Sequence, residues 1–543
     1  MMKRKKKLGK RIALAVAGSL FLGGCQADPM LKDTAESAGL ESDDTTGESV
    51  DGETGSVENP FPDDWYRTTY EVFVYSFADS DGDGIGDLNG LKEKLDYLND
   101  GKNGSGEDLE VSALWLMPIF PSPTYHKYDT TDYYGIDPQY GTIEDFKELL
   151  LECHKRDMKV ILDLAVNHTS VEHPWFKEHP EYYHFSDTPQ TGYAELKRDG
   201  RTQYYEARFW EGMPDLNLDS QAVREEIAGI TKYWLDLGVD GFRLDAVTSY
   251  YTDETPKNVE FLSWLKDTVK SQKADAYLVG ECWTGQETYA KYYDSGVDSF
   301  FDFAFADQSG LIAETVRGNR PMTSYVEALT KEETLYKEHD PDYINAPFYT
   351  NHDMGRSAGY YAYDDGTKTK FAGALNLLMP GNAFLYYGEE IGMKGSGKDE
   401  NKRAPMQWGD KDPAMCKGPA GMEQINMKFG MMDEQIGDGS SILQYYRKVI
   451  ALRNRYPVIA RGKTEAVEEL CGKDQCAFVR SVESDRYAPV MLVMNRSQEV
   501  ETVILPDNGF GELSDMLLTG EEEAVLSDGK LTLPPYAVAV LTK

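Results

Sequence analysis

The chain has 543 residues, of which 41% are hydrophobic and 12% aromatic, so it can bury one large core and one or two smaller ones. Its 93 acidic and 56 basic residues give a formal net charge of −37. That balance excludes a nucleic-acid partner, because binding to phosphate groups needs a basic surface.

The first residues predict targeting and anchoring. A basic start, MMKRKKKLGKR, precedes IALAVAGSLFL, an apolar stretch too short for a comfortable membrane span. The run ends in Leu-Gly-Gly-Cys25, which resembles a bacterial lipobox: residues 1–24 are the signal peptide and the thiol of Cys25 is lipidated. An ordinary signal peptide with a chance cysteine is the alternative. The polar residues 25–62 predict a disordered tether, so we expect an extracellular protein, anchored by lipid to the bacterial membrane.

From Tyr70 onward, apolar runs alternate with amphipathic helical patterns, which predicts an α/β fold, a closed (β/α)8 TIM barrel. The eight runs are YEVFVYSF, ALWLMPIF, KVILDLAV, GFRLDAV, AYLVGEC, SFFDFAF, INAPFYT and AFLYYGEE. The connection 169–219 is far longer than an ordinary loop and predicts an inserted domain. Alternating short runs over 463–543 predict a C-terminal antiparallel β-sandwich. The barrel is thus expected over 63–168 and 220–462.

Polar side chains cluster where the predicted strands end, which is where barrel enzymes build their sites. The third run ends in DLAVNH, the fourth in Arg243-Leu-Asp245, the fifth in Gly-Glu281, and the seventh is followed by Asn-His352-Asp353. A single carboxylate in such a place is more often a helix cap or a structural ion pair. Four such places in barrel order point to an active site.

These motifs carry a family resemblance. DLAVNH, GFRLDAV, GECW and TNHD resemble the four sequence regions of the α-amylase family of glycoside hydrolases (family 13), and MPDLN, YYGEEIGM and KRAPMQW extend the likeness over residues 64–543. The resemblance implies a barrel with an inserted domain B and a β-sandwich domain C. It also implies a retaining enzyme that acts on α-glucans, and we expect it to work as a monomer.

The resemblance also implies roles for single residues. Asp245 would be the nucleophile, Glu281 the general acid/base, and Asp353 the carboxylate that binds and distorts the −1 sugar. The implied substrate contacts are Tyr128, His168, Arg243, His352 and Arg403. Residues two apart in a strand point to the same side, so Arg243 should lower the pKa of Asp245. Glu281 has no such neighbour in sequence, and burial should raise its pKa. The bland alternative is an Arg–Asp pair that only stabilises the barrel.

The segment DSDGDGIGD follows the first run and offers oxygen ligands for a hard cation. The expected calcium ligands are Asp79, Asp81, Asp83, Asp87 and the carbonyl of Ile85. The segment resembles the calcium loop of oligo-1,6-glucosidase-like family members; an acidic turn without metal is the alternative. Two late cysteines, Cys471 and Cys476, could bridge a tight loop in an oxidising compartment.

Bond specificity is less constrained by the sequence. MPDLN lies between the MPKLN of neopullulanases and the QPDLN of oligo-1,6-glucosidases, which resembles the intermediary subfamily, largely of α-amylases. Thr248 and Ser249 stand where many α-amylases carry Lys-His. We expect an endo-acting α-amylase. The alternatives are an exo-acting α-glucosidase, oligo-1,6-glucosidase or neopullulanase-like enzyme and, from another class, a non-catalytic glucan-binding surface protein. Trp283 is either a stacking platform for sugar or a wall of the core.

Overall fold

The computed structural model describes residues 67–198, 200–423, 427–483 and 487–543. The predicted signal peptide, the tether, Cys25 and the first few residues of the predicted barrel lie outside the described residues. Every helix within the described ranges is too short or too polar to span a bilayer.

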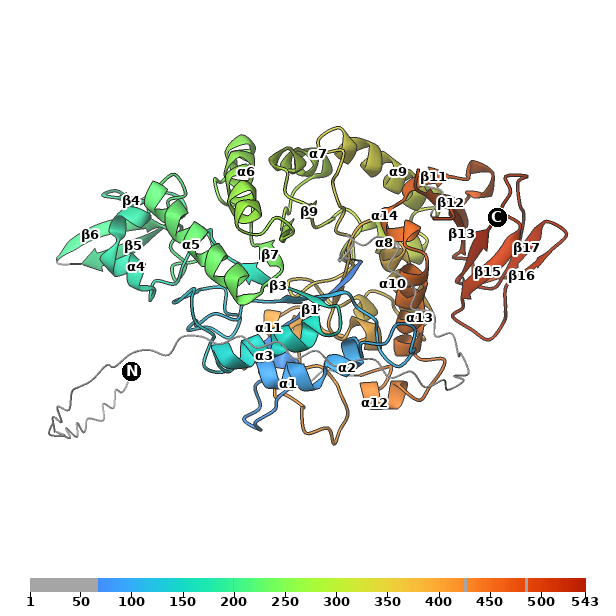
Figure 1. The fold of residues 1–543 in the computed structure, drawn as a ribbon, viewed down its shortest axis with the longest axis horizontal. Helices are drawn as coiled ribbons and strands as arrows, with labels where there is room; N and C mark the ends of the chain where they lie inside the picture. Colours follow the sequence, from blue (N-terminus) through green and yellow to red (C-terminus); the bar gives the residue numbers. More distant parts are fainter. Residues whose placement is uncertain (1–66, 199, 424–426, 484–486) are drawn as a thin grey trace, which may run out of the picture. The chain divides into compact units, whose positions relative to one another are not determined.

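A parallel sheet curls around the centre of the fold (Figure 1). Its strand order is β10-β1-β2-β3-β7-β8-β9. The strands are β1 (Thr68–Val72), β2 (Ala113–Leu116), β3 (Lys159–Leu164), β7 (Gly241–Leu244), β8 (Tyr277–Gly280), β9 (Ser299–Phe300) and β10 (Ala383–Tyr386). All of their pairings are parallel, as a βαβ repeat requires. The predicted barrel is therefore confirmed.

The seventh predicted run does not form a regular strand. It contributes two isolated parallel bridges, Phe301 to Ala346 on one side and Phe348 to Phe384 on the other, and these close the barrel between β9 and β10. Pro347 stands between the bridging residues and has no N–H to donate, so a continuous ladder cannot run through this segment.

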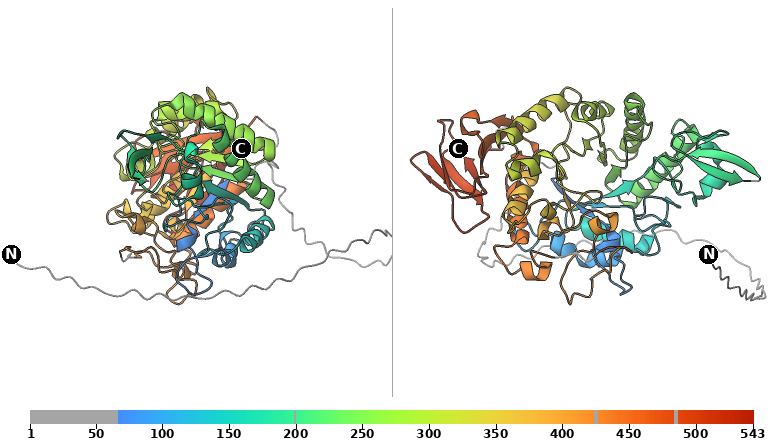
Figure 2. Two further views of the ribbon diagram at one scale, coloured as in Figure 1. Left: turned by 90° about the vertical axis from the view of Figure 1, so that its left-hand side faces the viewer. Right: turned by 180° about the vertical axis from the view of Figure 1, so that it is seen from behind.

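Helices follow most of the strands, and the longer ones cover the outside of the barrel (Figures 1 and 2). They are α1 (Leu88–Glu93), α2 (Leu95–Leu98), α3 (Ile143–His154), α5 (Gln221–Leu237), α6 (Thr255–Gln272), α7 (Gln286–Ala290), α8 (Leu311–Arg317), α9 (Thr323–Lys337), α10 (Thr367–Leu377), α11 (Asp399–Lys402), α12 (Met432–Gln435), α13 (Ile442–Arg455) and α14 (Val458–Arg461). Sequence signals set their ends. Thr142 and Asp145 form a capping box at the start of α3, and Gly238 ends α5 with φ 110°.

The barrel interior is filled by apolar side chains from its strands. Trp115, Ile161, Val279, Phe301 and Phe384 belong to one buried cluster there. Such a packed interior leaves no pore, so the chemistry is confined to the carboxyl ends of the strands.

Two further β regions are present: one interrupts the barrel sequence between β3 and β7, and the other follows the barrel. The segment after β3 holds helix α4 (Pro174–Glu178) and a small antiparallel sheet of β4 (Phe185–Ser186), β5 (Tyr193–Arg198) and β6 (Arg201–Glu206). The C-terminal region has two antiparallel sheets: β11 (Lys463–Ala466), β12 (Gln475–Ser481), β13 (Val490–Asn495), β15 (Glu512–Leu517) and β18 (Ala537–Thr542) form one, and β14 (Glu501–Ile504), β16 (Val525–Ser527) and β17 (Lys530–Leu533) form the other. Cys471 and Cys476 are both free, and the Sγ atom of Cys471 lies 3.5 Å from the carbonyl oxygen of Ala477.

Candidate active site

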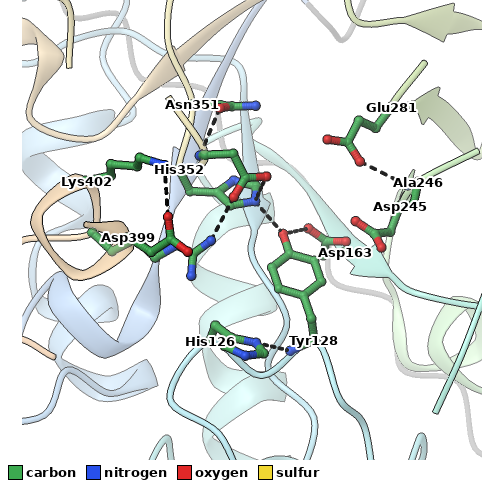
Figure 3. A network of polar contacts seen from close by, with 12 residues as sticks. His126, Tyr128, Asp163, Asp245, Ala246, Glu281, Asn351, His352, Asp399 and Lys402 are labelled. Atoms are coloured by element: carbon green, nitrogen blue, oxygen red, sulfur yellow. Dashed lines mark hydrogen bonds and ion pairs between the residues drawn. The ribbon is translucent and has the colours of Figure 1, made fainter. Parts of the chain in front are cut away.

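The acidic residues singled out from the sequence follow the barrel strands directly. Asp245 comes just after β7, Glu281 just after β8, and Asp353 a few residues beyond the bridge at Phe348. Ala246 turns the chain with φ 48°, and its N–H donates to Oε2 of Glu281 at 3.0 Å. Neighbouring parallel strands therefore bring Asp245 and Glu281 to the same end of the barrel (Figure 3).

Arg243 is the centre of this arrangement, and its side chain is fully buried. Its Nη1 lies 2.6 Å from Oδ1 of Asp245 and 2.9 Å from Oδ1 of Asp163, while its Nη2 lies 3.1 Å from Oε2 of Glu281. Its guanidinium also lies over the ring of Trp115, at 5.0 Å. One planar cation therefore holds three carboxyl groups in fixed directions, which a flexible ammonium group could not do.

The pKa values of these groups follow from burial and from that shared cation. Burial raises the pKa of both Asp245 and Glu281, and Arg243 opposes the rise in each case. Burial also raises the pKa of Asp163 to about 7. The direction for Glu281 agrees with the sequence prediction. The predicted lowering of the Asp245 pKa is wrong in its net direction, because burial outweighs the cation.

The charge count has a chemical consequence. Three carboxyl groups surround one cation, so the fully ionised cluster would carry excess negative charge in a buried place. Such a cluster titrates as a unit and retains a proton more readily than an exposed carboxylate does. The site can therefore keep one carboxylic acid ready to donate while another carboxylate stays ionised.

Asp353 has the opposite electrostatic setting. Its Oδ2 lies 3.3 Å from Nε2 of His352 and its Oδ1 lies 2.8 Å from Nη2 of Arg403. Although burial alone would raise it, these two cations hold the pKa of Asp353 well below its usual range. Asp353 is therefore ionised over the whole ordinary pH range.

His352 owes its charge to a residue that the sequence analysis missed. Nδ1 of His352 lies 2.5 Å from Oε1 of Glu71 in β1, and both side chains are buried. Burial would lower the pKa of His352, but Asp353 and Glu71 raise it to about 10. The signal in the sequence was a single charged residue inside TTYEV, a strand buried along its whole length.

Tyr128 joins the two halves of the site. Its hydroxyl donates to Oδ2 of Asp163 at 2.9 Å and lies 2.8 Å from Nε2 of His352, and its ring stacks on His352 with centroids 5.5 Å apart (Figure 3). A continuous polar chain therefore runs from Arg243 through Asp163 and Tyr128 to His352.

The other two expected substrate residues, His168 and Arg403, lie beside this polar network. His168 is buried, and burial lowers its pKa to about 4, so its ring is neutral. Its ring centroid is 5.2 Å from that of Phe209, which comes from the segment after β3 and is half exposed. Arg403 directly follows α11, where its Nη1 lies 3.2 Å from the hydroxyl of Tyr125.

A cleft of about 670 Å³ opens beside Asp353. Trp283 lines it with 55% of its surface exposed, and its ring stacks on Phe303 with centroids 4.8 Å apart and planes 18° apart. Of the two sequence interpretations of Trp283, the structure favours an exposed platform. The remaining walls include Asp307, Gln308, Tyr360, Lys394, Ser396, Asn401, Lys402 and Glu423.

The acidic loop after β1 lies apart from this network. Carboxylate oxygens of Asp79, Asp81 and Asp87 lie within 4.8 Å of one another, whereas Asp83 is not part of that group. Gly82 and Gly84 have φ 85° and 98°, and the N–H of each donates to a carboxylate oxygen of Asp79 at 2.7 Å. A compact set of oxygen ligands on a tight turn fits the preference of Ca²⁺.

Known proteins are similar to this chain in sequence and in fold. The family model "Alpha amylase, catalytic domain" matches residues 71–462. "Alpha-amylase 3" of Dictyoglomus thermophilum is 37% identical over 489 residues, covering 88% of this chain and 93% of the relative. The structure of Eubacterium rectale Amy13B superposes with a TM-score of 0.84 at 48% identity, covering 89% of this chain and 96% of that one. Trehalose-6-phosphate hydrolase of Bacillus subtilis is 29% identical over 577 residues, covering 88% of this chain and 98% of the relative.

Proposed function

Because the chain belongs to the α-amylase family of glycoside hydrolases, we propose that it is an endo-acting α-amylase that cleaves α-1,4 bonds of starch and maltooligosaccharides with retention. The observation that carries the retaining chemistry is the shared guanidinium of Arg243. It lies 2.6 Å from Asp245 and 3.1 Å from Glu281, so the two carboxyl groups sit on adjacent nitrogens of one rigid group. Retaining glycosidases need two carboxyl groups about 5–5.5 Å apart, and two groups held by one guanidinium support such a pairing.

The proposed reaction has two steps. Asp245 attacks the anomeric carbon while Glu281 donates its proton to the leaving glycosidic oxygen, which gives a covalent glucosyl-enzyme. Glu281, now ionised, then takes a proton from water, and that water releases the sugar from Asp245. The net result is hydrolysis with the anomeric configuration kept.

The remaining residues hold the sugar and its charge. Ionised Asp353, held by His352 and Arg403, faces the ring hydroxyls and favours the oxocarbenium-like state. Tyr128 offers an aromatic surface under the same ring. His168 is neutral, so it is suited to hydrogen bonding rather than to charge pairing.

Two observations support an α-amylase that binds long glucan chains. The cleft beside Asp353 is large and polar, and Trp283, two residues after the proposed acid, stands exposed along it. Two of the relatives are named as α-amylases, at 37% and 38% identity. The exo-acting alternative rests on relatives such as trehalose-6-phosphate hydrolase, which are less similar.

A product time course on amylose, pullulan, cyclodextrin and isomaltose tests this proposal. We expect amylose to give mixed maltooligosaccharides early, before glucose accumulates, because an endo enzyme cuts inside the chain. The reducing sugar should carry the α configuration when observed at once by NMR. Glucose as the sole early product, or faster cleavage of isomaltose than of maltooligosaccharides, would favour the exo alternative. Starch binding without any cleavage would favour the non-catalytic one.

We further propose that the acidic loop binds Ca²⁺ through Asp79, Asp81 and Asp87, with the carbonyl of Ile85 as a further ligand. When bound, the ion would connect Asp87, at the start of α1, to Asp79 and Asp81, in the loop after β1. Asp83 is the weakest of the expected ligands, because its carboxylate lies outside the close group.

Chelation of this ion should lower the melting temperature of the protein, by roughly 2 °C or more, because the loss of a bound ligand lowers folding stability. Asp81→Asn should abolish most of the shift and lower the calcium content measured by mass spectrometry. Asp83→Asn serves as the matched control and should keep the shift. An unchanged melting temperature after chelation, with no calcium in the purified protein, would contradict the assignment.

The anchor predicted from the sequence remains part of the proposal: an extracellular lipoprotein attached through Cys25. Cys25→Ser should move the protein from the membrane fraction to the medium or the soluble fraction, because the thiol that takes the lipid is gone. Immunoblots of cell fractions measure this. A variant that stays with the membrane, with no loss of incorporated labelled palmitate, would contradict the lipid anchor.

A further inference from the structure

A buried pair of acids lies behind the wall of the cleft, outside the catalytic network. Asp302 follows β9 and Glu332 lies in α9, and their exposed fractions are 1% and 2%. The two carboxyl groups lie against each other, and Oε2 of Glu332 is buried without a hydrogen-bond partner among the described residues. Two ionised carboxylates in contact, with no donor and no cation between them, repel each other, so this contact favours one proton on the pair.

The surroundings decide which residue carries the proton. Asp302 accepts hydrogen bonds from Nδ2 of Asn345 at 3.0 Å and from the N–H of Ala304 at 3.2 Å, as an ionised carboxylate does. Glu332 accepts from Nε2 of Gln286 and has the carboxyl of Asp302 against it. Glu332, whose Oε2 has no hydrogen-bond partner among the described residues, is therefore the acid that carries the proton, and it can offer that proton to Asp302.

No cation neutralises the pair. Among the described residues, neither Asp302 nor Glu332 forms an ion pair with a basic side chain. The titratable groups that face the pair are the tyrosines of the surrounding elements: Tyr289, Tyr293, Tyr336 and Tyr343. The ammonium group of Lys331 donates to Oε1 of Gln286 at 3.4 Å. A buried pair without a cation depends on its proton.

The pair holds both halves of the aromatic wall. Asp302 directly precedes Phe303, and its carboxylate accepts from the N–H of Ala304, directly after it. Gln286 opens α7, three residues after Trp283, and its side chain ends on Glu332. Trp283 and Phe303 stack on each other between these two anchors.

We propose that Glu332 is a positioning residue for the Trp283–Phe303 stack, and that through this stack it sets the affinity for sugar units on the leaving-group side of the scissile bond. The proposal rests on the glucan hydrolysis proposed above. Glu332 itself touches no substrate in this scheme. It acts by tying the loops after β8 and β9 to α9.

The experiment compares Glu332→Ala with Glu332→Gln, and uses Glu327→Ala and Glu327→Gln, at an exposed position of the same helix, as matched controls. Two substrates separate the effects: maltoheptaose, which fills the leaving-group side, and α-maltosyl fluoride, whose leaving group is a single atom. We expect Glu332→Ala to raise KM for maltoheptaose roughly 2- to 10-fold, the range of one aromatic contact, and to leave kcat/KM for the fluoride unchanged. Glu332→Gln can still donate to Asp302 and should behave as wild type.

The dependence of the melting temperature on pH tests whether Glu332 carries the proton. Burial raises the pKa of Glu332 well above its ordinary value in the folded protein. The stability that protonated Glu332 gives is therefore present at low pH and lost as the pH rises towards the folded pKa. As the pH rises from about 5 to about 9, the melting temperature of Glu332→Gln should rise relative to that of wild type by roughly 2 °C or more.

The outcomes are separable. Equal losses of kcat/KM on both substrates for Glu332→Ala would mean a general structural role and overturn the proposal. A melting-temperature difference between Glu332→Gln and wild type that stays flat with pH would overturn the protonated pair. Wild type that cleaves neither substrate would contradict the proposed function instead.

Discussion

Asp245→Asn is expected to lower kcat on maltooligosaccharides by roughly 10⁴-fold or more, as in other enzymes that lose their nucleophile. The amide cannot form the covalent glucosyl-enzyme, and Nη1 of Arg243 loses the carboxylate that lies 2.6 Å away. The fold should survive, because Asn has nearly the same shape and Arg243 keeps Asp163 and Glu281. Circular dichroism and a melting curve check this directly.

Azide distinguishes a nucleophile from other roles. With Asp245→Gly, azide has room to attack the sugar in place of the missing carboxylate and should give the β-glycosyl azide, with inverted configuration. Asp253→Asn, an exposed substitution in the loop after β7, is the matched control and should keep wild-type kcat. An Asp245→Asn enzyme with more than about a tenth of wild-type kcat would place the nucleophile elsewhere.

Glu281→Gln is expected to lower kcat/KM on maltooligosaccharides by roughly 10²–10⁴-fold, the usual contribution of general acid catalysis. The loss should nearly vanish for α-maltosyl fluoride, because fluoride leaves without a proton. This difference between substrates separates an acid from a residue that merely shapes the site. Glu287→Gln, exposed on α7, is the matched control.

The pH profile gives a second test of the same residue. Burial raises the pKa of Glu281, so the acid stays protonated to a higher pH than an exposed glutamate, and kcat/KM should fall on the alkaline side as this proton is lost. That alkaline limb should be missing in Glu281→Gln. An unchanged limb in the variant would assign the titration to another group.

Much of the site was predictable because its residues are fixed by the order of the strands. Asp245 and Glu281 each directly follow a strand, and adjacent parallel strands end at the same edge of a barrel. What spacing along the chain could not show was contact across strands. Arg243 reaches Glu281 from the neighbouring strand, so the apparent lack of a cation near Glu281 in the sequence was misleading.

Glu71 and the seventh predicted run are two further features that the sequence alone could not predict. Glu71 is one charge in a buried strand, and its partner His352 lies far along the chain, so no local pattern connects them. The run INAPFYT has the composition of a strand, but one proline was enough to reduce it to two bridges. The net pKa direction of Asp245 also depended on how deeply the fold buries it, which sequence neighbours do not report.

The irregular segment between β9 and β10 has a consequence for the position of Asp353. Asp245 and Glu281 directly follow β7 and β8, which are joined by a regular ladder, whereas Asp353 lies just past a segment that forms two isolated bridges. That segment is nevertheless hydrogen-bonded to both neighbours, because the N–H of Asp302 donates to the carbonyl of Ala346 and the N–H of Phe384 donates to the carbonyl of Pro347. A segment with no regular strand of its own can therefore close the barrel and hold Asp353 close enough to Asp245 to influence its pKa.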